Sequence, residues 1–69
     1  MDQGPPAYFD YLSPARDCRL TPEQVAALEA MERHEFPEDQ MMFELHMLRL
    51  IEQIRAGRLK IEEVLSPAK

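Results

Sequence analysis

Proline and glycine divide most of the chain into segments of helix length, and this spacing constrains the fold most. Pro22 directly follows Thr21, Pro37 comes about four helical turns later, and Gly57 follows another long segment. Proline is accepted in the first turn of a helix but breaks a helix interior, whereas glycine favours the left-handed conformation that ends helices. The spacing therefore predicts two consecutive helices and an all-α fold built on a small helical hairpin.

The first predicted helix covers residues 22–35. Thr21 is a good N-cap, Pro22 occupies the first helical position, and Gln24 completes a capping box. The apolar residues that share one side at helical spacing are Val25, Leu28 and Met31. Because this apolar side is narrow, we expect the helix to bury little surface.

The second predicted helix covers residues 37–56 and carries apolar residues on two sides. At about 100° per residue, one stripe consists of Phe43, Met47, Leu50, Ile51 and Ile54. The second stripe consists of Met41, Leu45 and Leu48. A helix with two apolar sides has to be covered twice. The first helix covers one side, so the other requires the N-terminal arm, the C-terminal segment or another chain.

The ends of the chain are predicted to differ from each other. Residues 1–20 form an N-terminal extended arm, because Pro5, Pro6 and Pro14 favour extended backbone before them. Residues 21–69 form the helical domain, which ends in a short C-terminal helix over residues 60–65. The arm is rich in aromatic side chains, namely Tyr8, Phe9 and Tyr11. It is therefore expected to pack over the helices or to be offered to a partner as a short motif, with a single helical turn at residues 7–12.

The small size of the chain favours association with another chain. With 69 residues, its hydrophobic core alone gives little net stability. Cys18 is the only cysteine, so no disulfide can form within the chain. We therefore expect a homodimer, a higher oligomer or docking on a protein partner.

Charge and hydropathy exclude several classes of partner. The chain has 13 acidic and 8 basic residues and a net charge of -5, which argues against direct nucleic-acid binding. The longest apolar run is only residues 25–28, whereas a membrane span needs about 20 residues, and the N-terminus lacks the pattern of a secretory signal. One cysteine and five methionines suit a reducing cytoplasm, so a cytoplasmic protein is expected.

Residues that could carry metal or redox chemistry occur without a recognisable spacing. The candidates are His34, His46, Cys18 and the methionines Met41, Met42 and Met47. Structural zinc sites and helical di-metal sites use repeated Cys, His or Glu-x-x-His patterns, and this chain has none. We expect no metal and no cofactor, although a metal-binding or redox protein remains an alternative function.

Catalysis is not expected. Cys18 lies between Asp17 and Arg19, whose charges have opposite effects on a thiol pKa. The carboxylate pairs are Glu32 with Glu35, Glu38 with Asp39, and Glu62 with Glu63, and they suit solvated helix surfaces. The chain has no glycine-rich phosphate loop, and it is too short to enclose a large pocket.

The sequence thus predicts a small acidic protein–protein interaction module without catalytic activity. Its contact residues are expected on the arm and on the second helix, namely Tyr8, Phe9, Tyr11, Met41, Phe43, Leu45, Met47, Leu48 and Ile51. A second alternative uses the acidic segment 23–39 to imitate phosphates and inhibit a nucleic-acid-binding protein. The partner and the biological process stay open.

Overall fold

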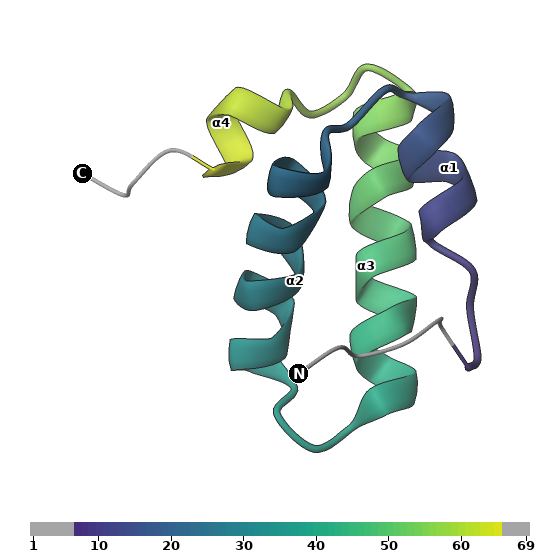
Figure 1. The fold of residues 1–69 in the computed structure, drawn as a ribbon, viewed down its shortest axis with the longest axis vertical. Coiled ribbons are helices and arrows are strands. Elements are labelled where there is room, and N and C mark those ends of the chain that lie inside the picture. The colour runs from purple at the N-terminus through teal and green to yellow at the C-terminus, as the bar shows by residue number, and fades with distance from the viewer. Residues whose placement is uncertain (1–6, 66–69) are drawn as a thin grey trace.

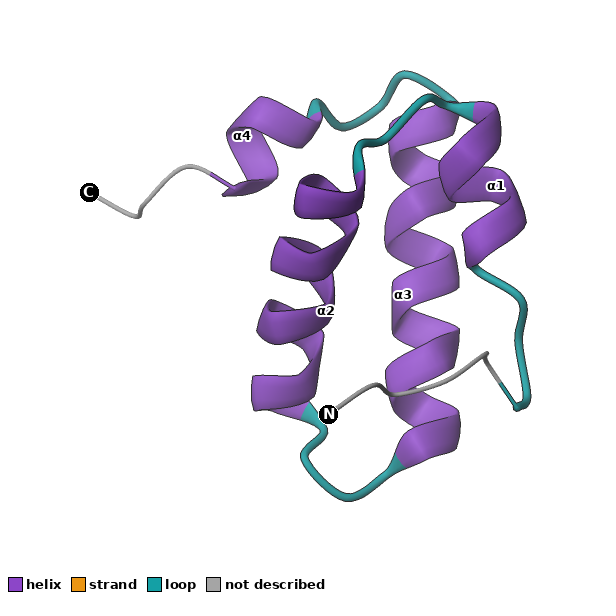
Figure 2. Cartoon of the chain, viewed as in Figure 1, coloured by secondary structure: helices purple, strands orange, loops and turns teal. Residues whose placement is uncertain are grey.

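The computed structural model describes residues 7–65, which contain helices and no strands (Figures 1 and 2). The helices are α1 (Leu12–Asp17), α2 (Pro22–Glu35), α3 (Gln40–Arg55) and α4 (Ile61–Leu65). The prediction of an all-α fold with two long helices is confirmed.

The two long helices lie side by side and run in opposite directions (Figure 1). Helix α1 packs against α3, and α4 packs against α2. Figure 1 shows α4 beside the beginning of α2 and α1 beside the second half of α3. Helix α3 is therefore covered by α2 on one side and by α1 on another.

Helix α2 has the bounds that its capping residues predict. The Thr21 hydroxyl accepts a hydrogen bond from the Gln24 N–H at 3.1 Å, and the Gln24 side chain accepts one from the Thr21 N–H at 2.9 Å. At the other end, Phe36 is the C-cap, and Pro37 follows outside the helix. Local capping and proline placement fix this helix.

Helix α3 begins at Gln40, so the predicted start at residue 37 is wrong. The Asp39 carboxylate accepts a hydrogen bond from the Met42 N–H at 3.1 Å and acts as the N-cap. Its capping position leaves Pro37 in the connection rather than in the first helical turn. The end is as predicted, because Gly57 has a φ of 84° and follows the Ala56 C-cap.

The described part of the arm contains a helix, α1, which corrects the prediction of an extended segment over residues 1–20 with one turn at 7–12; residues 1–6 of this prediction lie outside the described residues. The Asp10 carboxylate accepts hydrogen bonds from the N–H groups of Leu12 at 3.0 Å and Ser13 at 3.2 Å. Pro14 lies in the first turn, where its missing N–H leaves no helical hydrogen bond unmade. Pro14, which was expected to favour extended backbone before it, is thus compatible with a helix start.

The core joins residues from every helix and from the residue before α1. It consists of Tyr11, Ala15, Leu28, Phe43, Met47, Ile51 and Ile61. The ring of Tyr11 meets the ring of Phe43 edge-on, with centroids 6.1 Å apart. The N-terminal segment therefore completes the hydrophobic core.

Candidate interaction surface

Four of the nine predicted contact residues belong to the core rather than to the surface. Phe43, Met47 and Ile51 have no exposed area, and Tyr11 is 2% exposed. Their side chains hold α2, α3 and α1 together, so the folded monomer does not expose them. The prediction of these four as contact residues is corrected accordingly.

The other five predicted contact residues are exposed or half-buried, and we call them the arm–α3 surface. They are Tyr8, Phe9, Met41, Leu45 and Leu48. Tyr8 is 59% exposed and Met41 is 47% exposed. Met41, Leu45 and Leu48 follow one side of α3 at one-turn spacing. Glu44, which accepts hydrogen bonds from the arm, lies one helical turn from both Met41 and Leu48.

A buried carboxylate holds the arm in this position. Glu44 has no exposed area, and its carboxylate accepts hydrogen bonds from the N–H groups of Ala7 at 2.8 Å, Tyr8 at 2.5 Å and Phe9 at 2.9 Å. Gln40, one turn earlier on α3, donates its side-chain amide to Oε2 of the same carboxylate, the oxygen that also accepts from Ala7. The sequence pattern did not identify this role of Glu44.

The hydrogen bonds favour the charged form of Glu44. Burial alone raises the pKa of a carboxyl group, but the bonds from Gln40 and from the backbone of Ala7, Phe9 and Tyr8 outweigh it and lower the pKa of Glu44 to about 2. The arm is therefore fastened by an ionised carboxylate that is shielded from water.

This pKa predicts a loss of stability in acid. The usual pKa of a glutamate is 4.5, and the folded chain lowers that of Glu44 to about 2. A depressed folded pKa stabilises the fold above the unfolded pKa, and this contribution decreases as the pH falls from about 4.5 to about 2. We expect urea titrations to show a decreasing free energy of unfolding over this range. In Glu44→Gln the acid dependence should be smaller, and an unchanged dependence would contradict the assignment.

The Glu44 site is connected to α2 through Arg33. The Arg33 guanidinium donates to the Gln40 side-chain oxygen at 2.7 Å and to the Phe36 carbonyl at 3.3 Å. It also lies 3.8 Å from the centroid of the Phe43 ring. Arg33 thereby orients Gln40, which in turn binds Glu44. The arm is thus linked to both long helices.

Tyr11 provides a second attachment of the N-terminal segment to α2. Its hydroxyl donates a hydrogen bond to the Glu29 carboxylate at 2.6 Å. Burial of the ring and this hydrogen bond both raise the pKa of Tyr11, so the hydroxyl stays protonated. Next to this bond, α1 and α2 form a groove of about 310 Å³ whose lining is Leu12, Ala15, Arg16, Leu20, Pro22, Val25 and Glu29.

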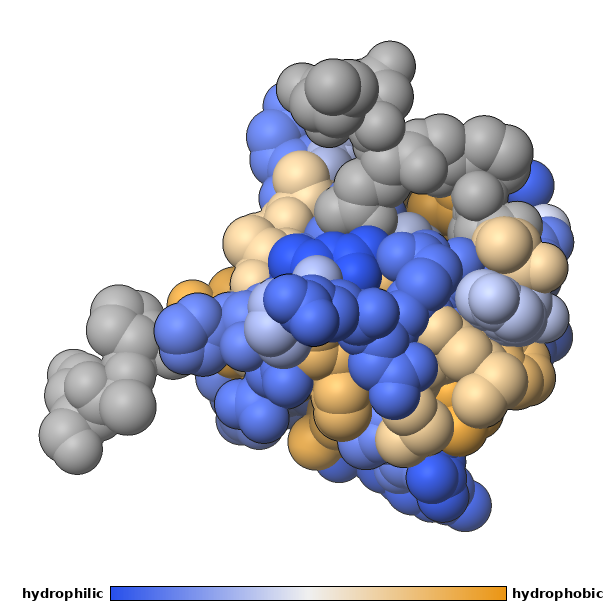
Figure 3. Space-filling model, turned by 90° about the horizontal axis from the view of Figure 1, so that it is seen from below, coloured by the Kyte–Doolittle hydropathy of each residue, from blue (hydrophilic) through white to orange (hydrophobic). Residues whose placement is uncertain are grey.

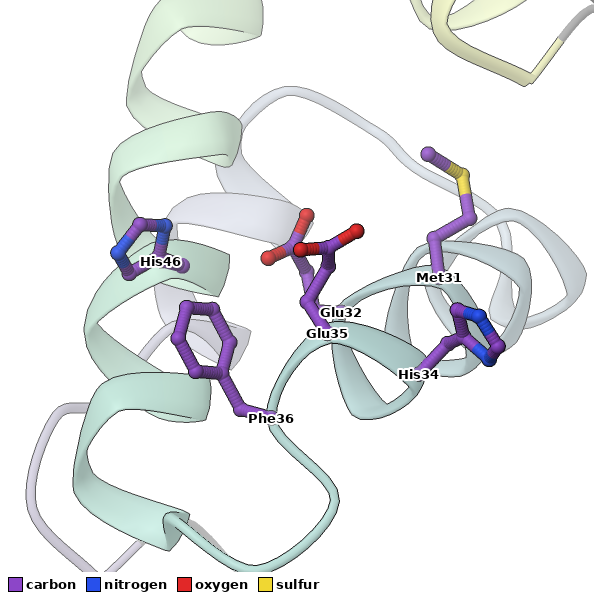
Figure 4. Close-up of a pocket in the computed structure, with 6 residues that line it drawn as sticks. All are labelled: Met31, Glu32, His34, Glu35, Phe36 and His46. Carbon is purple, nitrogen blue, oxygen red and sulfur yellow. The ribbon is translucent and has the colours of Figure 1, made fainter.

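A larger open pocket of about 580 Å³ lies at the other end of α2 and brings together several residues that the sequence analysis considered for chemistry. Figure 4 shows Glu32 and Glu35 extending from α2 toward α3, whereas Met31 and His34 extend in other directions. The ring of His46 packs at a tilt over Phe36, with centroids 4.6 Å apart. Burial raises the pKa of Glu32, His46 lowers it and Glu35 raises it, and the net direction is upward.

The candidate metal-binding and thiol residues lie apart from one another in the described part of the chain. Among residues 7–65, no three His, Cys, Asp or Glu side chains are grouped so that they could hold a metal ion. Cys18 is half-buried, and its thiol donates to the Ala15 carbonyl at 3.6 Å. The pairs 38–39 and 62–63 are exposed, and Asp39 caps α3. The described part of the chain also has no helix of the length and apolarity that a membrane crossing requires.

Apolar side chains reach the surface in separate patches at the end of the molecule that carries the α2–α3 connection. Figure 3 shows this end, where hydrophobic areas alternate with hydrophilic ones. No family model, curated protein or solved structure matches the chain. The arm–α3 surface therefore has to be interpreted from its own chemistry.

Proposed function

We propose that the protein is a non-catalytic protein–protein interaction module of the cytoplasm and that the arm–α3 surface is its binding surface. A second copy of the chain is the first candidate partner, and a larger cytoplasmic protein for which the chain acts as an adaptor or regulator is the second. The observation that carries the proposal is the exposure of two large apolar side chains, 59% for Tyr8 and 47% for Met41, on the surface that Glu44 organises.

The chemistry of these side chains suits a protein partner. Aromatic residues and methionine are enriched at protein interfaces because they are large, and methionine adapts to the shape of its partner. Exposed apolar residues that occur singly need no explanation, but Met41 continues the stripe of Leu45 and Leu48.

Anchoring of the arm before binding supports the same function. A flexible segment loses conformational entropy when it binds, and this loss weakens the complex. Here the backbone of residues 7–9 is already fixed by Glu44. Tyr8 can therefore contact a partner while the backbone beneath it stays in place.

A pair of methionine variants tests the surface. We expect Met41→Glu to weaken self-association by about tenfold or more, because a charge enters an apolar contact. Met31→Glu is the matched control, since Met31 is 40% exposed on α2 outside the arm–α3 surface. Light scattering over a wide concentration range, with reductant present, measures both. Equal effects of the two variants would contradict self-association through this surface.

A heterologous partner is tested with the same pair. If the wild-type chain is monomeric, immobilised wild type and both variants are compared for capture of cellular proteins. The adaptor role requires a protein that the wild type and Met31→Glu retain and that Met41→Glu loses. Capture that does not distinguish the two variants would argue against the proposed surface.

A further inference from the structure

We propose that two copies of the chain form a dimer by exchanging residues 7–17, so that the arm and α1 of each copy pack on α3 of the other. We call residues 7–17 the exchanged segment and residues 18–21 the hinge. This dimer uses the contacts of the folded core and does not depend on the exposed side chains of the arm–α3 surface.

The first observation is a left-handed residue in the hinge. Arg19 has a φ of 64°, and among residues 7–65 it is the non-glycine residue with a positive φ. The N–H groups of Arg19 and Leu20 donate to the carbonyls of Arg16 and Ala15, both at 3.0 Å, which is the Schellman turn that usually has glycine at this position. An extended hinge releases the steric strain at Arg19.

The turn between α3 and α4 has the same hydrogen bonds as the turn at Arg19 but has glycine at the left-handed position. Gly57 has a φ of 84°, and the N–H groups of Gly57 and Arg58 donate to the carbonyls of Ile54 and Gln53 at 3.1 Å and 3.0 Å. The same turn therefore occurs twice, once with glycine and once with arginine. Strained short hinges favour the exchange of segments between copies.

The second observation concerns the form of the open hinge. Pro22 is the first residue of α2, and proline disfavours helical backbone in the residue before it. Thr21 is accordingly extended, with φ -75° and ψ 159°. Opening therefore disfavours the fusion of α1 and α2 into one helix and favours an extended connection to a second copy.

The third observation is that the partners of the exchanged segment lie outside it, where a second copy offers the same groups. Ala7, Tyr8 and Phe9 donate to Glu44 of α3, and Tyr11 donates to Glu29 of α2 and packs on Phe43 of α3. An exchanged dimer keeps all of these contacts. Each arm–α3 surface then contains Tyr8 of one copy and Met41 of the other.

The fourth observation is that detachment of residues 7–17 leaves buried groups without partners, so the segment has to pack on α3 again, either in the same copy or in another. Without the segment, Glu44 loses three backbone donors and Phe43 loses the Tyr11 ring. The open monomer is therefore unstable, because its apolar core is exposed to water and a buried carboxylate lacks donors. Recapture by the same copy gives the monomer, whereas recapture by a second copy gives the dimer at high protein concentration.

Isotope-filtered NMR tests the exchange directly. A sample is prepared by unfolding and refolding an equal mixture of ¹³C-labelled and unlabelled full-length chain at high concentration. In the exchanged dimer, contacts between the rings of Tyr11 and Phe43 connect a labelled chain with an unlabelled one. In a dimer formed through the arm–α3 surface these contacts stay within one chain, and this result would overturn the proposal.

Hinge variants give an independent measurement. Arg19→Gly should favour the closed hinge of each monomer by a factor of about five, because glycine adopts a positive φ without steric strain. Since a dimer opens two hinges, its dissociation constant should rise about 25-fold. Arg19→Val should change the constant in the opposite direction, because a β-branched residue tolerates a positive φ poorly. Gly57→Val is the matched control, since it strains the same type of turn outside the hinge.

The outcomes separate this proposal from the proposed function. Exchange requires that Arg19→Gly and Arg19→Val change the dissociation constant of the dimer and that Gly57→Val does not. A dimer that responds to Met41→Glu and ignores the hinge variants would overturn exchange and leave the arm–α3 surface supported. A monomeric Arg19→Val chain at millimolar concentration, folded by circular dichroism, would also overturn exchange.

Discussion

Glu44→Gln should lower the free energy of unfolding by about 3 kcal/mol, because it removes the charge that accepts the backbone hydrogen bonds of the arm. The amide has nearly the shape of the carboxylate, so the packing around residue 44 is retained. Its NH₂ group, however, faces N–H donors, which leaves polar groups unpaired in a site without exposed area. Urea denaturation followed by circular dichroism measures the change.

Glu52→Gln is the matched control, because it makes the same chemical change on the same helix. The Glu52 side chain is 46% exposed and forms a 3.5 Å ion pair with Arg55. Exposed pairs of this kind contribute about 1 kcal/mol or less. Hydrogen exchange should also be faster at the N–H groups of residues 7–9 in Glu44→Gln than in Glu52→Gln. Similar stability and exchange in the two variants would refute the anchoring role of Glu44.

Phe43→Ala should destabilise the chain by about 4 kcal/mol, which is enough to unfold much of a protein of this size. Phe43 has no exposed area, and its ring lies perpendicular to the Tyr11 ring and against the Arg33 guanidinium. Truncation leaves a cavity where α1, α2 and α3 meet. Thermal unfolding by circular dichroism gives the result, and Phe43→Leu should retain most of the stability because it fills much of the space.

Phe36→Ala provides the comparison for Phe43→Ala. Phe36 is partly exposed and packs on His46 at the edge of the α2–α3 connection. Solvent and neighbouring side chains can fill the space that its ring leaves, so we expect a loss of about 1 kcal/mol. A larger loss for Phe36→Ala than for Phe43→Ala would contradict the placement of the core.

The long helices could be predicted because their signals are local. Thr21, Gln24 and Pro37 determine the bounds of α2 through capping and backbone geometry, and Gly57 determines the end of α3. Helix α1 was missed because proline both favours extended backbone before it and is accepted in the first turn of a helix. Only the hydrogen bonds of Asp10 show that Pro14 lies in a first turn. The prediction failed where one residue type fits two structures.

The contact residues were predicted less well, because helical periodicity identifies apolar sides but not what covers them. Phe43 and Met41 belong to different stripes of α3, and both stripes looked equally available in the sequence. The structure buries Phe43 and leaves Met41 exposed. Glu44 was missed for the same reason, since its burial depends on the arm, which is distant in sequence.

Glu44 holds the arm through the backbone of residues 7–9 and not through their side chains. The carboxylate binds peptide N–H groups, which every residue except proline supplies, and the Tyr8 side chain is 59% exposed. Substitutions of that side chain should therefore cost the fold little. Under the proposed function, a change at this one exposed residue would alter the preferred partner while the scaffold beneath it stays the same.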